Sequence, residues 1–285
     1  MFMLLVNDFK DYEIISMSKG EKLEKWGDYY LLRPDPEIIW KDTLNKSIVH
    51  AHYHRSNKGG GYWENYKKLP DRWTINYKDL TFNVKLMGFK HTGIFPEQSI
   101  NWDFMIKKIK ESKRDIKVLN LFAYTGCATV ACLSAGATVV HVDSSRGMIE
   151  WAKENVKSSN LADKPVRFLV DDVVKFVKRE IRRGNKYDAI IMDPPSYGRG
   201  SNNEIWDIEK DLFPLVELCT EILNDDPLFF IINSYTANLS GIVMENILKL
   251  TIGKIYPGKI YYEELGIKSK NNLVLPCGVC ARYEK

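Results

Sequence analysis

The feature that most constrains the fold is an alternation, from about residue 116 onward, of apolar runs of strand length with amphipathic stretches of helical length. The strand-like runs cover residues 118–123, 138–142, 166–170, 187–192 and 228–233. Helical patterns follow these runs, at residues 126–135, 147–158, 172–183, 211–223 and 240–250. Strands that are apolar throughout and separated by helices indicate a parallel sheet covered on both faces. We therefore predict an open α/β sheet, closed by two strands at 259–262 and 273–282.

The first hundred residues follow a different pattern. Short strand-like runs at 29–32, 48–54 and 80–87 are separated by turn residues, of which Pro34-Asp35-Pro36 is the strongest stop. This pattern predicts a smaller β-rich domain at residues 1–105, followed by the α/β domain at residues 106–285.

The positive charge is concentrated in the N-terminal part. Residues 1–115 hold 20 Lys and Arg against 16 Asp and Glu, which accounts for the whole net charge of +4. One cluster of cationic side chains stands out: Lys107, Lys108, Lys110, Lys113 and Arg114. A basic patch favours a polyanionic partner, although a solvated helix face explains the charge equally well.

Two features of the sequence bear on location. The apolar run at residues 1–6 is too short for a signal-peptide core, and no run approaches the roughly 20 residues of a membrane helix. Five cysteines without regular spacing are typical of a reducing compartment. We expect a cytoplasmic protein that binds no membrane.

The loops that follow the predicted strands carry the candidate chemistry, because ligands of an open α/β sheet bind at the carboxyl ends of its strands. The first loop, residues 120–126, has bulky residues where a dinucleotide fingerprint has glycines, so a nucleoside without phosphates fits better. Asp143 ends the second strand and suits ribose hydroxyls. Asp171 and Asp172 end the third, where a carboxylate can accept from an adenine amino group. Asp193 ends the fourth.

Two segments resemble motifs of the class I S-adenosylmethionine-dependent methyltransferases. They are Leu-Asn-Leu-Phe-Ala-Tyr-Thr-Gly at 119–126 and Asp-Pro-Pro-Ser-Tyr at 193–197. The nearest resemblance is to the bacterial 23S rRNA cytosine-5 methyltransferases and their relatives. Residues 89–98 resemble the segment that those enzymes carry before the catalytic domain. The resemblance implies a Rossmann-like methyltransferase domain behind a β-rich domain. It also implies an enzyme that transfers a methyl group from S-adenosylmethionine to RNA, with ribosomal RNA as the favoured substrate.

The resemblance also assigns site residues. Those expected at the cofactor are Thr92, Phe95, Gln98, Asn120, Phe122, Ala123, Thr125, Gly126, Asp143, Ser144, Asp171, Asp172 and Asp193. Among them, Asn120, Phe122 and Ala123 would line the methionine part, Asp143 would take the ribose, and Asp172 or Asp171 the adenine. Asp193, Pro194 and Pro195 would form the catalytic site and position the methyl acceptor.

The sequence departs from the cytosine-5 pattern at the nucleophile. Attack on C6 of cytosine needs a thiolate, but neither residues 194–196 nor residues 233–236 include a cysteine. We interpret Cys127, beside the cofactor loop, as a small helix residue. Cytosine-5 chemistry is therefore doubtful, an exocyclic amine is compatible with the motif, and the acceptor atom stays open.

Two other functions remain open from the sequence: a methyltransferase that acts on a protein or small molecule, and a non-catalytic module that binds the cofactor or RNA. We expect no metal. His50, His52 and His54 alternate along one strand, but no nearby cysteine or second histidine cluster completes a site. Cys277 and Cys280 form a single C-x-x-C, which is too few ligands for zinc.

Overall fold

The computed structural model describes residues 3–56, 59–200, 204–236 and 239–285. The chain forms two compact units. One, the α/β unit, consists of Asn101–Leu265 and Gly278–Lys285 together with the N-terminal residues up to Leu4. The other, the β-rich unit, consists of Leu5–Ile100 and Gly266–Cys277. The domain boundary that we expect between residues 105 and 106 stays a prediction.

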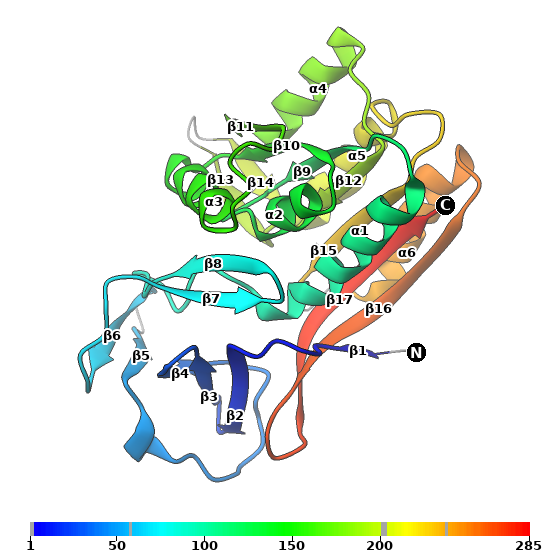
Figure 1. The fold of residues 1–285 in the computed structure, drawn as a ribbon. Coiled ribbons are helices and arrows are strands. Elements are labelled where there is room, and N and C mark those ends of the chain that lie inside the picture. The colour runs from blue at the N-terminus through cyan, green and yellow to red at the C-terminus, as the bar shows by residue number, and fades with distance from the viewer. Residues whose placement is uncertain (1–2, 57–58, 201–203, 237–238) are drawn as a thin grey trace. The chain divides into compact units, whose positions relative to one another are not determined.

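An eight-stranded sheet forms the centre of the α/β unit, in the order β1-β16-β17-β15-β12-β9-β10-β11 (Figure 1). Its strands are β1 (Met3–Leu5), β9 (Lys117–Leu121), β10 (Thr138–Asp143), β11 (Val166–Val170), β12 (Ala189–Met192), β15 (Phe229–Ser234), β16 (Lys259–Lys268) and β17 (Val274–Glu284). Strands β11, β10, β9, β12 and β15 are parallel, and β17 runs antiparallel to β15. The expected α/β fold is confirmed.

Among the residues that the structure describes, six helices connect or flank these strands: α1 (Ser99–Ser112), α2 (Cys127–Ser134), α3 (Arg146–Ser158), α4 (Val173–Arg183), α5 (Ile208–Thr220) and α6 (Gly241–Leu250). Alternate strand residues point to opposite faces of a sheet. On one face, Leu119 and Leu121 share a core cluster with residues of α4, α5 and α6. On the other, the side chains of Asn120 and His141 bond to Thr129 of α2. Helices therefore cover both faces, as the all-apolar strands indicate.

The strand order reverses between β9 and β12. The chain proceeds from β9 outward through β10 to β11 and then returns to the other side of β9 to form β12. At such a reversal the loops after the two strands diverge, and this is the position at which open α/β sheets bind ligands. The loops after β9 and β12 are those at residues 122–126 and 193–196.

The β-rich unit contains a five-stranded sheet of β2 (Tyr12–Ser18), β3 (Glu21–Trp26), β4 (Tyr29–Pro34), β5 (Ala51–Arg55) and β6 (Gly61–Asn65), in that order. Strands β7 (Trp73–Tyr77) and β8 (Leu80–Val84) form a separate hairpin. Short 3-10 helices are η1 (Lys46–Ile48) and η2 (Pro96–Gln98) here, and η3 (Ile252–Lys254) in the α/β unit. The expected β-rich N-terminal part is confirmed.

A buried ion pair lies inside the five-stranded sheet. The Arg33 guanidinium donates from Nε and Nη2 to the two oxygens of Glu24, at 2.5 and 2.7 Å, and Tyr12 OH donates to the same carboxylate at 2.7 Å. Because the two charges compensate each other, both side chains can be buried without leaving an unpaired charge in the core.

The structure differs from the sequence-based expectation in several places. Strands β2, β3, β6 and β7 were not predicted, and two further differences lie in the α/β unit. The hairpin of β13 (Tyr197–Arg199) and β14 (Ile205–Asp207) was not expected, because strands of three residues show no periodicity. Helix α5 begins at Ile208, capped by Asp207, and ends at Thr220, three residues ahead of the predicted 211–223. In the part of the chain that the structure describes, no helix is long and apolar enough to cross a membrane.

Candidate functional site

The loop after β9 is held in an unusual backbone conformation. Phe122 and Tyr124 have φ values of 53° and 49°, in the left-handed region that non-glycine residues seldom occupy, and Gly126 has φ 79°. A Cβ atom at Gly126 would lie 2.8 Å from Cβ of Ala152, so this position also needs glycine for close packing against α3. Strain of about 1–3 kcal/mol per non-glycine residue persists only where surrounding contacts impose it, and it is concentrated at functional sites.

Asp143, at the end of β10, supplies those contacts. Its Oδ2 accepts the backbone N–H of Tyr124 at 2.9 Å, and its Oδ1 accepts the N–H of Ser145 at 2.8 Å. Burial raises the pKa of this carboxyl, and the two N–H donors oppose the increase. Each carboxylate oxygen has a second lone pair. Asp143 can therefore hold the loop and still accept ligand hydroxyls.

The carboxylates after β11 are engaged differently. Asp172 caps α4, with its Oδ1 accepting the N–H of Lys175 at 2.9 Å, which is the usual role of Asp at a helix start. Asp171 forms an ion pair with Arg179. The backbone N–H of Asp171 also donates to the carbonyl of Asp143 at 3.0 Å, which ties the third strand end to the second.

A cavity joins these loops to the loop after β12. It is lined by Phe122, Asp143, Ser144, Asp171, Asp172, Val173, Pro195, Gly198, Arg199, Gly200, Glu204 and Trp206. Four of these residues carry carboxylates. Among the described residues of this lining, Arg199 carries the one cationic side chain. The carboxylates repel phosphate groups and accept hydrogen bonds from hydroxyl and amino groups, so this set of acceptors suits a phosphate-free nucleoside with a positive charge.

Trp206, on β14, fixes the loop after β12. Its indole Nε1 donates to the carbonyl of Pro195 at 2.7 Å, and its ring lies 4.8 Å from the ring of Phe122, centroid to centroid. Asp193 is half-buried and Pro194 is buried. Trp206 therefore connects the loop after β9 to the Asp-Pro-Pro turn. Sequence reasoning did not identify this residue, since an isolated tryptophan in a short strand gives no functional signal.

The loop after β15 meets the same turn. The hydroxyls of Ser196 and Thr236 form a hydrogen bond at 2.6 Å. Asn233, at the end of β15, is buried and accepts at Oδ1 from Asn101 at 2.9 Å. Asn101 Oδ1 in turn accepts from Arg282 Nη2 at 2.6 Å, and Arg282 pairs with Glu263 at 2.9 Å. A buried polar chain thus supports the strand end beside Asp193.

Three other residues expected at the cofactor form hydrogen bonds within the protein. Asn120 is buried on the α2 side of β9, where its amide donates to Thr129 at 3.1 Å. Thr125 is buried, and its carbonyl accepts from Asn155 at 2.8 Å. Ala123 anchors the loop through its N–H to the carbonyl of Val142 at 3.1 Å. The cofactor contacts expected of these three residues stay predictions.

Three of the expected residues belong to the β-rich unit. Thr92 and Gln98 are buried and Phe95 is half-buried, with Gln98 in η2. Their expected role at the cofactor also stays a prediction.

None of the thiols is activated. All five cysteines are free, and burial is the main cause that raises the pKa of each. For Cys127, which lies beside the cofactor loop, burial raises the pKa to about 12. A thiol acts as a nucleophile only as the thiolate, so these cysteines are poor nucleophiles at neutral pH.

Comparison with known proteins identifies the family of this chain. Residues 20–236 match a family described as S-adenosylmethionine-dependent methyltransferase. The ribosomal RNA large subunit methyltransferase K/L of Syntrophotalea carbinolica is 30% identical over 206 residues, which is 70% of this chain and 28% of that protein. Methyltransferase K of Neisseria meningitidis is 25% identical over 238 residues, 79% of this chain and 65% of that protein. The chain thus spans less than two thirds of either relative.

Solved structures agree as well. A SAM-dependent methyltransferase from Agrobacterium tumefaciens superposes with a TM-score of 0.94 at 32% identity, covering all of this chain and 93% of that one. A putative methyltransferase from Streptococcus mutans, at 20% identity, shares the fold with a TM-score of 0.74 over 97% of this chain and 76% of that one. With acidic strand ends around one cavity and a family match over three quarters of its length, this chain belongs to the S-adenosylmethionine-dependent methyltransferases.

Proposed function

We propose that this enzyme methylates a nucleotide base of ribosomal RNA. The proposal rests on the match of 70% and 79% of the chain to two relatives named for methylation of large-subunit ribosomal RNA. Support for the site comes from the switch point, where the acidic strand ends and Pro195 of the Asp-Pro-Pro turn line one cavity. Asp193 and Pro194 precede Pro195 in that turn and do not line the cavity.

We assign the methyl donor to the cavity. Bound S-adenosylmethionine supplies a methyl group made electrophilic by its positive sulfonium. Asp143 would accept from the ribose hydroxyls through the lone pairs that its backbone donors leave. Asp171 or Asp172 would accept from the adenine amino group, and the ring of Phe122 would pack against the bound nucleoside.

We assign the acceptor to the turn after β12. Two successive prolines lack N–H donors and restrict the backbone, and Trp206 fixes the second of them through its carbonyl. Asp193 would therefore hold a base N–H by accepting its hydrogen bond, in an orientation that aligns the acceptor atom with the methyl group. The raised pKa values of the cysteines favour a nitrogen acceptor, which needs no thiolate attack on the ring.

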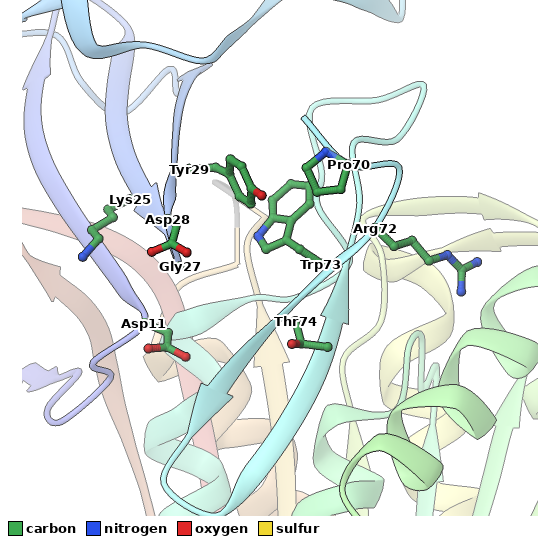
Figure 2. Close-up of a pocket in the computed structure, with 9 residues that line it drawn as sticks. All are labelled: Asp11, Lys25, Gly27, Asp28, Tyr29, Pro70, Arg72, Trp73 and Thr74. Atoms are coloured by element: carbon green, nitrogen blue, oxygen red, sulfur yellow. The ribbon is translucent and has the colours of Figure 1, made fainter. Parts of the chain in front are cut away.

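We further propose that RNA contacts a recess in the β-rich unit (Figure 2). This recess, of about 520 Å³, is lined by Asp11, Lys25, Gly27, Asp28, Tyr29, Pro70, Arg72, Trp73 and Thr74. The rings of Tyr29 and Trp73 lie 5.1 Å apart, edge to face, and the Trp73 indole donates to the carbonyl of Trp26 at 3.1 Å. Anchored rings with cationic neighbours are the usual elements of single-strand binding, in which bases stack on aromatic side chains.

The cationic cluster at the end of α1 fits this role less well. Lys108 pairs with Glu284 at 2.7 Å, and Arg114 pairs with Asp188 at 2.6 Å. Charges already neutralised within the protein release few counterions from RNA. Lys107, Lys110 and Lys113 are exposed, so this helix end can add to the binding but offers fewer available charges than the sequence suggests.

Nucleoside mass spectrometry of ribosomal RNA tests the proposal. Cells without the gene should lack one methylated base that reappears when the gene is restored. An identical set of ribosomal marks in both strains would contradict ribosomal RNA as the substrate. A steep salt dependence of RNA binding by the purified protein would then separate another RNA from a protein or small-molecule substrate.

A further inference from the structure

A second group of polar side chains lies in the β-rich unit, on the sheet formed by β5 and β6 (Figure 1). His52 and His54 are two residues apart on β5, so both point to the same face. Strand β6 pairs antiparallel with β5 and places Glu64 directly opposite His52. Two imidazoles and one carboxylate thus project from adjacent strands to one side of the sheet.

The ligand atoms of this group are close enough to share one ion. One nitrogen from each imidazole and one oxygen from Glu64 all lie within 4.8 Å of one another. The two imidazole rings are 4.0 Å apart, centroid to centroid, and His54 Nε2 lies 2.9 Å from Glu64 Oε2. Tetrahedral zinc with bonds of about 2.0–2.1 Å separates its ligand atoms by about 3.3 Å. Small side-chain rotations would bring the three atoms to that spacing.

Neighbouring residues orient the candidate ligands. Glu21 Oε1 lies 2.6 Å from His52 Nε2, an arrangement in which Nε2–H donates to the carboxylate and the Nδ1 lone pair faces away from it. Tyr66 OH donates to Glu64 at 2.7 Å. Such outer contacts, and above all a carboxylate that accepts from a histidine, recur around metal sites, where they fix the imidazole orientation.

The group is accessible from solvent. His52 retains 11% of its side-chain exposure and His54 32%. A metal ion can therefore reach the imidazole nitrogens and the carboxylate of Glu64.

We propose that His52, His54 and Glu64 bind one divalent transition-metal ion, for which zinc is the best match to two nitrogens and one carboxylate oxygen. The ion replaces the proton between His54 and Glu64, and water completes its coordination. Because β6 is the edge strand of its sheet, the ion fastens this edge to β5. The sequence drew attention to His52 and His54, but we expected no metal because no further ligand was evident. Glu64 comes opposite His52 only through strand pairing.

Titration calorimetry of the full chain with zinc, using protein without a histidine tag, tests the proposal. We expect one zinc per chain, a zinc-dependent rise in melting temperature, and the visible absorption of tetrahedral Co²⁺ when cobalt replaces zinc. His54→Gln and Glu64→Gln should abolish stoichiometric binding. Glu21→Gln, which changes the outer contact with His52 and the pair of Glu21 with Lys46, should weaken it about 10–100-fold.

His50→Gln is the matched control. His50 lies just before β5 and outside the group, and its Nδ1 accepts the N–H of Tyr30 at 3.2 Å, which a glutamine oxygen can replace. Zinc affinity should be unchanged in this variant. The proposal is overturned if the parent binds no stoichiometric zinc, or if well-folded His54→Gln binds zinc as tightly as the parent. These readouts need no methyl transfer, so they succeed or fail independently of the proposed function.

Discussion

Glu24 in the β-rich unit and Asp143 in the α/β unit are both largely withdrawn from water, but their partners differ. Burial alone would raise the pKa of Glu24, yet Arg33 and Lys22 lower it to about 2. Asp143 has backbone N–H groups as its partners, and burial raises its pKa. A carboxylate enclosed by its own cation has little capacity for a ligand, whereas one held by two peptide groups retains lone pairs. The comparison separates a residue that supports the fold from one that is available to the cofactor.

Removal of the buried charge at Glu24 should have the largest effect on stability. Glu24→Gln leaves the Arg33 guanidinium buried without its counter-charge, so the free energy of unfolding should fall by about 3–5 kcal/mol. Urea unfolding measures this change. Glu13→Gln, which removes a half-exposed partner of Lys270, is the control and should cost less than about 1 kcal/mol. Equal losses in the two variants would contradict the structural role of Glu24.

Asp143 should matter for ligand binding. On the proposed assignment, Asp143→Ala removes two charge-assisted hydrogen bonds to the ribose, roughly 2–4 kcal/mol, so the affinity for S-adenosylhomocysteine should fall more than tenfold. Calorimetry measures this affinity, with the exposed Asp163→Ala as the control. Unchanged affinity in Asp143→Ala would assign the ribose to another residue.

The two carboxylates should also respond differently to pH. On the proposed assignment, the ionised form of Asp143 accepts the ribose hydroxyls, and its pKa in the folded protein is raised above the ordinary value of about 3.9. Affinity for S-adenosylhomocysteine should therefore decline as the pH falls through that raised pKa, by at most about tenfold per pH unit. Glu24 stays ionised over this range. Calorimetry from neutral to mildly acidic pH should show the decline in the parent and its absence in Asp143→Asn.

The smallest effect concerns RNA. Lys25→Gln removes a cation at the recess, which should flatten the plot of log affinity against log salt by about one unit. Lys108→Gln removes a cation already paired with Glu284 and should leave the slope unchanged. Fluorescence anisotropy with ribosomal RNA fragments at several salt concentrations gives both slopes. An unchanged slope in the recess variant together with a flatter slope in Lys108→Gln would place the RNA contact at α1 instead.

Comparison of the two units also shows what a single sequence can predict. The strands and helices between residues 117 and 183 follow their hydrophobic pattern, and β11 has the predicted bounds, because a buried parallel strand needs a continuous apolar run. The acidic strand ends were found because their position after each strand is local information. By contrast, the roles of Trp206, Glu64 and Arg114 depend on partners that only the folded chain brings beside them: Phe122, His52 and Asp188. No local pattern indicates such contacts.

Asp193 provides the most direct test of the central claim, that the strand-end carboxylates hold the donor while the Asp-Pro-Pro turn performs transfer. Single-turnover methyl transfer to ribosomal RNA from a deletion strain should fall at least about a hundredfold in Asp193→Ala, with S-adenosylhomocysteine affinity within a few-fold of the parent. Ser196→Ala and Cys127→Ala should retain transfer. Parental rates in Asp193→Ala, or loss of transfer in Cys127→Ala together with a covalent RNA adduct in the parent, would contradict the account.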